Sequence, residues 1–156
     1  MSMPRPVGFG ASVELPDCDF ETRSPAGFHW DAARNKYTAL PPATTGKKKG
    51  LPVVGAAVYA MHPDTDALSF TFDLKDSTGS ELWIPGMPNP ARAFEHVASG
   101  GLFEAWHASF EWYVWNYVMT RRYGWPAMPA RQMRCAMAKA RAFGLPGDRK
   151  SVCRER

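Results

Sequence analysis

Alternating hydrophobic and polar residues predict β-strands in the first half of the chain. Residues 67–74, ALSFTFDL, alternate strictly, and the side chains on one face are Leu68, Phe70, Phe72 and Leu74. Residues 81–86 give a second short strand that a Pro-Gly pair ends, and residues 75–80, KDSTGS, are typical of a hairpin connection. Residues 12–20 form a weaker strand, which Pro16 interrupts.

Helical patterns dominate the second half. Residues 89–99 predict a helix with Asn89 as its cap and Pro90 at its first position. A buried strand over residues 102–109 and two further helices follow, over residues 110–122 and 129–143. Strands followed by alternating helix, strand and helix predict an α/β fold, a mixed β-sheet with helices packed on it.

A length of 156 residues suits one domain with its own core. We expect that domain to span residues 12–147, after a flexible N-terminus over residues 1–11 and before a basic tail over residues 148–156. Residues 25–50 contain Pro, Gly, Thr and three lysines without periodicity, which predicts a mobile loop insertion. No apolar run reaches the roughly 18 residues of a membrane span, so no membrane partner is expected.

The charge is divided unevenly along the chain. Residues 121–156 hold ten Lys/Arg and two Asp/Glu, a net charge of +8, whereas residues 1–120 hold nine and thirteen, a net charge of −4. Such a basic segment suits either a phosphate-rich partner or a solvated helix face. Three widely spaced cysteines and an N-terminus without an apolar signal region predict a cytoplasmic protein, in a host cell if the chain is phage-encoded.

Two carboxylates, Asp19 and Glu21, stand two residues apart at the end of the first predicted strand. Residues i and i+2 of a strand point to the same face, so both carboxylates lie side by side and Phe20 points into the opposite layer. Hard oxygen ligands at this spacing suit Mg²⁺ or Mn²⁺. The pattern Asp-x-Glu is common, however, and by itself also describes an acidic turn.

A third acidic residue, Glu111, follows the predicted strand over residues 102–109 at the start of a helix. A carboxylate there either complements the helix dipole or joins Asp19 and Glu21 in a two-metal site. His107, four residues earlier, is either an edge histidine or a ligand.

Several short motifs then follow one another in a meaningful order: DFETRS, HPDTD, LWIPG, HASFEW, RRYGWP and RCAMAKARAFGLPG. In their order and spacing they resemble the proofreading 3′–5′ exonuclease domain of phage and bacterial family A DNA polymerases. That domain is a DEDD exonuclease with an RNase H-like fold. The resemblance covers residues 12–147 apart from the insertion over residues 25–50.

The resemblance implies that Asp19, Glu21 and Glu111 are catalytic metal ligands in a hydrolase that removes nucleotides from single-stranded DNA ends. In such sites two divalent ions, about 4 Å apart, stabilise the attacking and leaving oxygens. Two departures from the family pattern affect this expectation. Trp106 and His107 stand where the family has His-Asn, so His107 would replace the Asn that contacts the substrate strand. No Tyr-x-x-x-Asp follows Gly147, so the fourth carboxylate is absent from this sequence.

The missing motif predicts weak or no exonuclease activity for this chain alone. It also predicts an incomplete sheet, whose edge is either exposed or covered, for example by a protein partner. The alternative is therefore a non-catalytic, exonuclease-derived module that binds nucleic acid or a protein, as an interaction or inhibitor protein. A fragment of a polymerase gene is a third interpretation.

Other residues carry weaker signals for nucleic-acid binding. The aromatic side chains of residues 110–117 either pack in the core or stack on bases. Arg121 and Arg122 either contact phosphates or complement a helix C-terminus. The last of these signals is a run of three lysines, which would be generic phosphate contacts: Lys47, Lys48 and Lys49.

Overall fold

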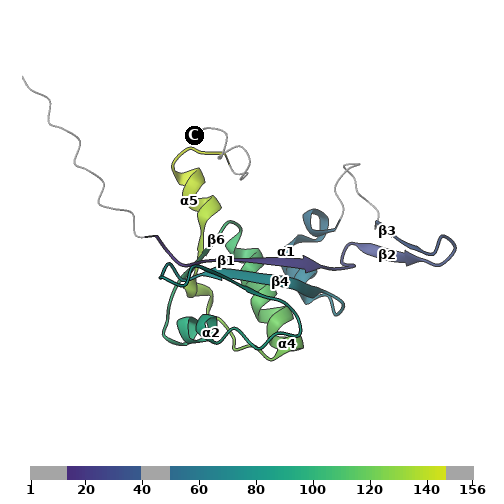
Figure 1. Cartoon of the computed structure of the whole chain (residues 1–156). Coiled ribbons are helices and arrows are strands. Elements are labelled where there is room, and N and C mark those ends of the chain that lie inside the picture. The colour runs from purple at the N-terminus through teal and green to yellow at the C-terminus, as the bar shows by residue number, and fades with distance from the viewer. Residues whose placement is uncertain (1–13, 40–49, 147–156) are drawn as a thin grey trace, which may run out of the picture.

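A five-stranded mixed sheet forms the centre of the protein in the computed structural model, which describes residues 14–39 and 50–146 (Figure 1). The strand order is β5-β4-β1-β6-β7. β1 pairs antiparallel with β4 and parallel with β6; β4 and β5 are antiparallel, and β6 and β7 are parallel. The strands are β1 (Asp17–Arg23), β4 (Asp66–Asp73), β5 (Ser80–Trp83), β6 (Phe103–Ala105) and β7 (Met133–Cys135).

Helical segments connect these strands. They are α1 (Leu51–Met61), α2 (Ala91–Ala98), α3 (Ala108–Tyr113), the π-helical turn η1 (Val114–Met119), α4 (Thr120–Tyr123), the 3₁₀ turn η2 (Ala130–Gln132) and α5 (Ala136–Ala142). α3, η1 and α4 form one continuous run, which Gly124 ends in the left-handed conformation with φ of 66°. A separate hairpin consists of β2 (Phe28–Asp31) and β3 (Lys36–Ala39). None of the helices in the described ranges is long and apolar enough to span a bilayer.

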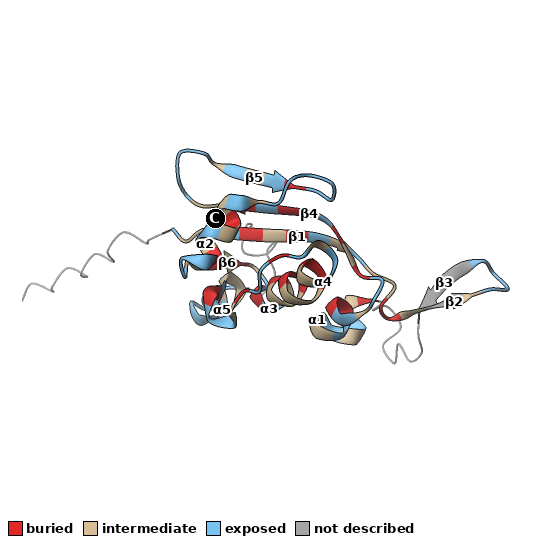
Figure 2. Cartoon of the chain, turned by 90° about the horizontal axis from the view of Figure 1, so that it is seen from below, coloured by how far each residue is buried: buried red, intermediate tan, exposed pale blue. Residues whose placement is uncertain are grey.

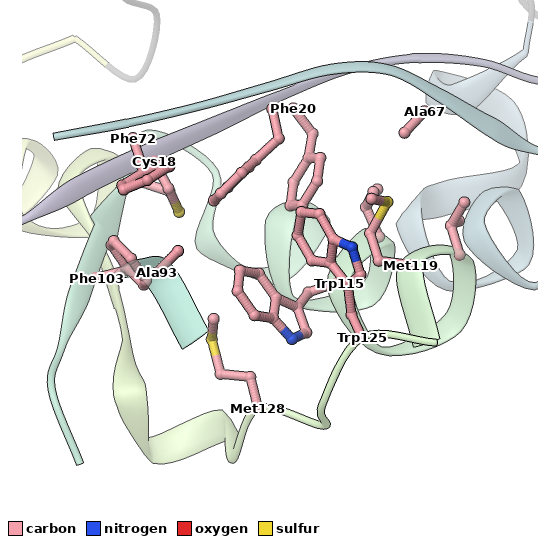
Figure 3. Packing of buried hydrophobic residues seen from close by; sticks show 14 of the residues in the cluster. Cys18, Phe20, Ala67, Phe72, Ala93, Phe103, Trp115, Met119, Trp125 and Met128 are labelled. Carbon is pink, nitrogen blue, oxygen red and sulfur yellow. The ribbon is translucent and has the colours of Figure 1, made fainter. Parts of the chain in front are cut away.

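The hydrophobic core lies between the sheet and the α3–η1–α4 run. Alternate residues of β1, Cys18 and Phe20, point into it, and the ring of Phe20 lies 4.5 Å from that of Phe70 on β4. Trp115 is fully buried beneath them, with its ring 4.9 Å from that of Trp125 (Figure 3). Aromatic rings at these separations add to the free energy of burial.

The other residues of β1 form what we call the outer face of the sheet. Asp17, Asp19 and Glu21 share this face, because side chains alternate along a strand. Thr71 lies opposite Asp19, and Leu82 lies opposite Thr71; both are exposed. Figure 2 shows β5, β4 and β1 side by side, with the labelled helices on the β1 side of that group.

The expected mixed α/β fold is confirmed, and the strand over residues 67–74 and the helix over residues 89–99 are confirmed in place. Pro90, rather than Asn89, is the N-cap of that helix, and no side chain caps it. Leu68 is exposed and does not share the buried face with Phe70, because the β1–β4 register shifts between Glu21 and Thr22.

Three regions differ from the sequence-based expectation. The strand expected over residues 102–109 ends at Ala105, and residues 108–109 already belong to α3. Residues 129–143, expected to form one helix, contain η2, the strand β7 and the shorter helix α5. The sheet therefore has a parallel edge strand that the sequence pattern did not predict, since a three-residue strand shows no periodicity. Residues 25–50, expected to be a loop, contain the β2–β3 hairpin and the start of the α1 segment at Gly50; residues 40–49 lie outside the described part.

Candidate functional site

Asp19 and Glu21 project from the outer face of β1, as their spacing predicts. Glu21 is exposed and Asp19 is half-buried. Asp19 lines a cavity of about 350 Å³, together with Asp17, Cys18, Thr71, Glu104, Ala105, Trp106 and Ala136. Two of the carboxylates in this cavity have cationic partners: Asp17 contacts Lys75 at 2.6 Å, and Glu104 contacts Lys139 at 3.4 Å.

Glu111 lies in the first turn of α3 and only 4% of its surface is exposed. Its Oε2 atom accepts a hydrogen bond of 3.0 Å from the backbone amide of Phe20. Phe20 is the residue between Asp19 and Glu21, so the two acidic motifs, 91 positions apart in sequence, meet in the fold. The contact is made through the backbone of β1, whereas Asp19 and Glu21 project from its outer face.

These carboxylates do not form a ready metal centre. Within residues 14–39 and 50–146, no three His, Cys, Asp or Glu side chains are grouped so that they could hold a metal ion. Mg²⁺ and Mn²⁺ require several oxygen ligands around one point. The arrangement therefore does not fit the two-ion site that the resemblance implies, and we derive no reaction step through a metal.

The negative charge around β1 affects Cys18, which the sequence analysis did not connect with the site. Burial raises the pKa of the Cys18 thiol well above its ordinary value, and the nearby carboxylates of Glu111, Asp17 and Asp19 raise it further. A thiol under these conditions stays protonated and unreactive. Cys18 therefore acts as a small core residue here, and its raised pKa reflects its burial first and the nearby carboxylates second.

His107 is the exposed residue that precedes α3, and its Nδ1 atom lies 3.3 Å from Oγ of Ser109. It borders an apolar cavity of about 490 Å³ between α1 and α3. The other residues that line this cavity are Leu51, Pro52, Gly55, Ala56 and Phe110. Gly55 interrupts α1 there with φ of 79° and ψ of 163°, a conformation essentially restricted to glycine.

The aromatic residues of the α3–η1 run belong mainly to the core. Trp115 is fully buried and donates to the carbonyl of Pro126 at 2.7 Å, and Trp112 donates to the carbonyl of Met128 at 2.8 Å. The less buried members pack against the same core, namely Phe110, Tyr113 and Tyr117. These contacts favour core packing over base stacking for Trp112 and Trp115.

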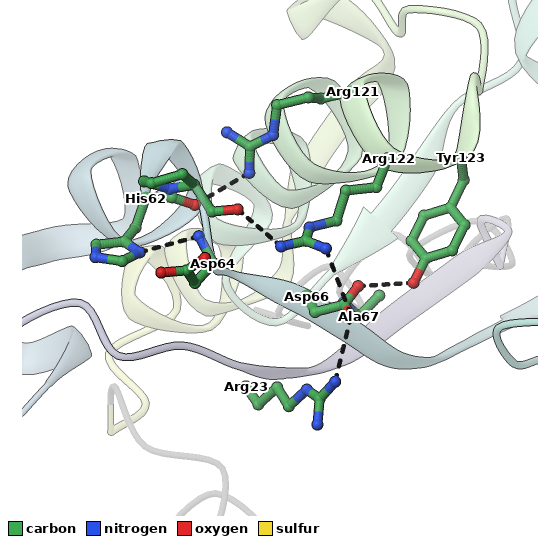
Figure 4. A network of polar contacts seen from close by, with 9 residues as sticks. Arg23, His62, Asp64, Asp66, Ala67, Arg121, Arg122 and Tyr123 are labelled. Atoms are coloured by element: carbon green, nitrogen blue, oxygen red, sulfur yellow. Dashed lines mark hydrogen bonds and ion pairs between the residues drawn. The ribbon is translucent and has the colours of Figure 1, made fainter. Parts of the chain in front are cut away.

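Arg121 and Arg122 contact the C-terminal end of α1 (Figure 4). Arg121 donates to the carbonyls of Met61 and His62 at 3.2 and 3.0 Å. Arg122 donates to the carbonyl of Pro63 at 2.7 Å and lies 3.8 Å from the carboxylate of Asp66. Both arginines thus complement a helix C-terminus, although of a different helix from their own. Lys47, Lys48 and Lys49 lie outside the described residues.

Hydroxyl groups attach the end of β1 to α1 and its following turn, a feature that the sequence pattern does not reveal. The hydroxyls of Thr22 and Tyr59 are 3.1 Å apart, and that of Ser24 hydrogen-bonds with the buried Thr65. The Thr65 hydroxyl donates in turn to the carbonyl of Tyr59 at 2.6 Å. Together with the Phe20–Glu111 bond, these contacts fix both the middle and the end of β1.

Comparison of the chain with protein-family models, with curated proteins and with solved structures gives no significant match.

Proposed function

We propose that this chain is a DEDD-type 3′–5′ exonuclease-like domain with an RNase H-like fold, which binds single-stranded DNA ends and hydrolyses them weakly or not at all on its own. The hydrogen bond between Phe20 and Glu111 is the observation that carries the proposal. Two motifs that resemble the first and second exonuclease motifs are in direct contact, although 91 positions separate them.

The topology of the sheet supports the same proposal. A central β1 with an antiparallel pair on one side and two parallel strands on the other is typical of RNase H-like sheets. Asp19 and Glu21 lie on the central strand, and Glu111 lies in the first turn of the helix that follows the neighbouring parallel strand.

The apolar cavity between α1 and α3 supports binding of a nucleobase. Its volume of about 490 Å³ and its Phe110 ring suit the flat apolar face of a base, and His107 at its rim can donate a hydrogen bond to a phosphate or sugar oxygen. The scattered carboxylates support weak hydrolysis, because an enzyme of this class needs its acidic groups to converge on the reacting phosphate.

A labelled single-stranded oligonucleotide, incubated with Mn²⁺, tests the proposal. We expect binding by the wild type that falls steeply as salt is raised. Any degradation should vanish in Asp19→Asn and persist in Glu95→Gln, a matched control on the exposed surface of α2. Failure of the wild type to bind or degrade the oligonucleotide would refute the proposal.

The alternative function is a non-catalytic module that binds a protein partner through the sheet. The outer face favours this alternative: Leu82 on β5 is 55% exposed and Leu68 on β4 is 48% exposed, beside the carboxylates of β1. Exposed apolar side chains beside charged ones are common at protein interfaces. Absence of any nucleic-acid binding in the assay above would favour this alternative over the exonuclease-like domain.

A further inference from the structure

We infer that Glu111 is a positioning residue, whose buried carboxylate replaces the strand partner that β1 lacks at Phe20 and thereby fixes the backbone from which Asp19 and Glu21 project. The structural part of this inference is independent of nuclease chemistry. Its functional consequence, that the positions of Asp19 and Glu21 depend on Glu111, rests on the proposed function.

The pairing between β1 and β6 is short. It is limited to Asp17 opposite Glu104, and the amide of Glu104 donates to the carbonyl of Pro16 at 2.7 Å. β6 ends at Ala105. The carbonyl of the next residue, Trp106, accepts a hydrogen bond from the amide of Met137 at 3.2 Å, so this carbonyl is directed toward the β7–α5 junction. Beyond Asp17, β1 therefore has no strand ladder on this side.

The amide of Phe20 lies where the next ladder bond would form. A buried backbone N–H without an acceptor costs about as much as a lost hydrogen bond. Oε2 of Glu111 accepts this bond at 3.0 Å, in place of a carbonyl on a neighbouring strand. The bond also gives the buried carboxyl group a hydrogen-bond partner, which helps to offset the cost of its burial.

Phe20 is held at two points as a result. Its ring packs against Phe70 at 4.5 Å and against Trp125 at 6.1 Å, and its amide is bound by Glu111. The neighbouring side chains, Asp19 and Glu21, project from the opposite face of the same strand. Their spacing and direction are therefore set by a residue that is anchored on both its side chain and its backbone.

Amide hydrogen exchange, read residue by residue with NMR, tests the inference in the full chain. We expect Glu111→Gln to keep the exchange rate of the Phe20 amide within about threefold of the wild type, because the Gln carbonyl oxygen is also an acceptor. Glu111→Ala should accelerate exchange at Phe20 by about tenfold or more relative to the amide of Phe70, and should lower Tm by about 5 °C.

Two further variants keep the test decisive if Glu111→Ala does not fold. Glu111→Asp shortens the side chain by one methylene, and we expect it to accelerate exchange at Phe20 as Ala does. Glu104→Gln changes a carboxylate on the adjacent strand and should leave Phe20 unaffected. The inference is overturned if Phe20 exchanges at the wild-type rate in both Ala and Asp variants, or if Gln accelerates it as much as Ala.

Oligonucleotide binding adds a functional measurement. If the proposed function holds, Glu111→Ala should bind the oligonucleotide more weakly than Glu111→Gln does; equal loss in both variants would contradict a positioning role. If the wild type binds no oligonucleotide, the proposed function fails, while the exchange pattern of Phe20 still decides the role of Glu111.

Discussion

The hydroxyl group of Tyr123 donates a hydrogen bond of 2.7 Å to Oδ1 of Asp66, and this bond joins the end of α4 to the first residue of β4. Asp66 also lies 3.5 Å from the guanidinium of Arg23 and 3.8 Å from that of Arg122, so it is the centre of the network in Figure 4. Burial and the hydrogen bond to Asp66 raise the pKa of Tyr123 to about 12. The hydrogen bond therefore stabilises the protonated phenol of Tyr123 and the ionised carboxylate of Asp66.

The raised pKa of Tyr123 predicts a loss of stability in alkali. Its value in the unfolded chain is about 10, so the protonated phenol contributes stability below pH 10 that is lost as the pH rises through about 12. We expect Tyr123→Phe to be less stable at neutral pH and to lose less further stability between pH 10 and 12. Denaturant unfolding across this range measures the effect, with Tyr117→Phe as the control. Parallel curves for wild type and Tyr123→Phe would contradict it.

The lowered pKa of Asp66 predicts a loss of folding stability in acid. Burial alone would raise the pKa of Asp66, but the hydrogen bond from Tyr123 and the charge of Arg122 lower it overall. The ionised carboxylate thus contributes stability that is present above its unfolded pKa of about 4 and is lost as the pH falls below that value. We expect Asp66→Asn to show a shallower acid dependence of unfolding than the wild type. Asp64→Asn, on the exposed turn before β4, should keep the wild-type dependence.

The hydrogen bonds of the Asn116 side chain predict that its removal destabilises the π-helical turn η1. Its Nδ2 atom donates to the carbonyls of Trp112 and Met128 at 3.0 and 3.1 Å, and its Oδ1 atom accepts from the amide of Met128 at 3.0 Å. We expect Asn116→Ala to lower the free energy of unfolding by about 2–3 kcal/mol, because the amide of the buried Met128 loses its acceptor. Asn89→Ala, at an exposed position, should change it by less than about 0.5 kcal/mol. Similar values for both variants would rule out this role.

The sequence predicts those helices and strands that are long enough to show a periodic pattern of hydrophobic residues. The strand at residues 67–74 and the helices around residues 89–99 and 110–122 are long enough to show alternation or a helical stripe, and each is found close to its predicted position. The three-residue strand β7 and the four-residue strands β2 and β3 are too short to show either pattern. These short strands exist through tertiary pairing, which local sequence does not encode.

The candidate site shows the same limit. The parity of Asp19 and Glu21 follows from strand geometry alone, and their shared face is found as predicted. The contact between Glu111 and Phe20 depends on where β6 ends and how α3 meets β1, so the sequence predicted proximity without its chemistry. The choice of α1 as the partner of Arg121 likewise depends on a contact that spans about 60 positions.

A side chain at position 101, where the chain has Gly101, would collide with the ring of His96. A Cβ atom at position 101 would meet the His96 ring more closely than real Cβ contacts allow, and that ring is held by the carbonyl of Leu102 at 3.0 Å and by Phe103. We expect Gly101→Ala to lower the free energy of unfolding by about 1–3 kcal/mol. The cost should fall by at least half in a His96→Ala background, as a double-mutant cycle measures. An equal cost in both backgrounds would show that the ring is not the obstacle.

Variants of Arg121 and Arg122 test whether these residues have a structural role or bind phosphate. Both guanidinium groups are directed at carbonyls at the C-terminal end of α1 and in the turn that follows, at Met61, His62 and Pro63. We expect the double variant Arg121→Gln/Arg122→Gln to lower Tm by about 2–4 °C, because these exposed but charge-assisted bonds are lost. Arg141→Gln, on the exposed surface of α5, removes a positive charge of the same basic segment without such bonds and should leave Tm unchanged. Oligonucleotide titrations at several salt concentrations, at a temperature where the double variant is folded, separate the two roles. If the arginines only fix α1, the slope of log affinity against log salt concentration is the same in the double variant as in the wild type. A reduction of that slope by about one or two ion equivalents would instead assign these arginines to phosphate contacts.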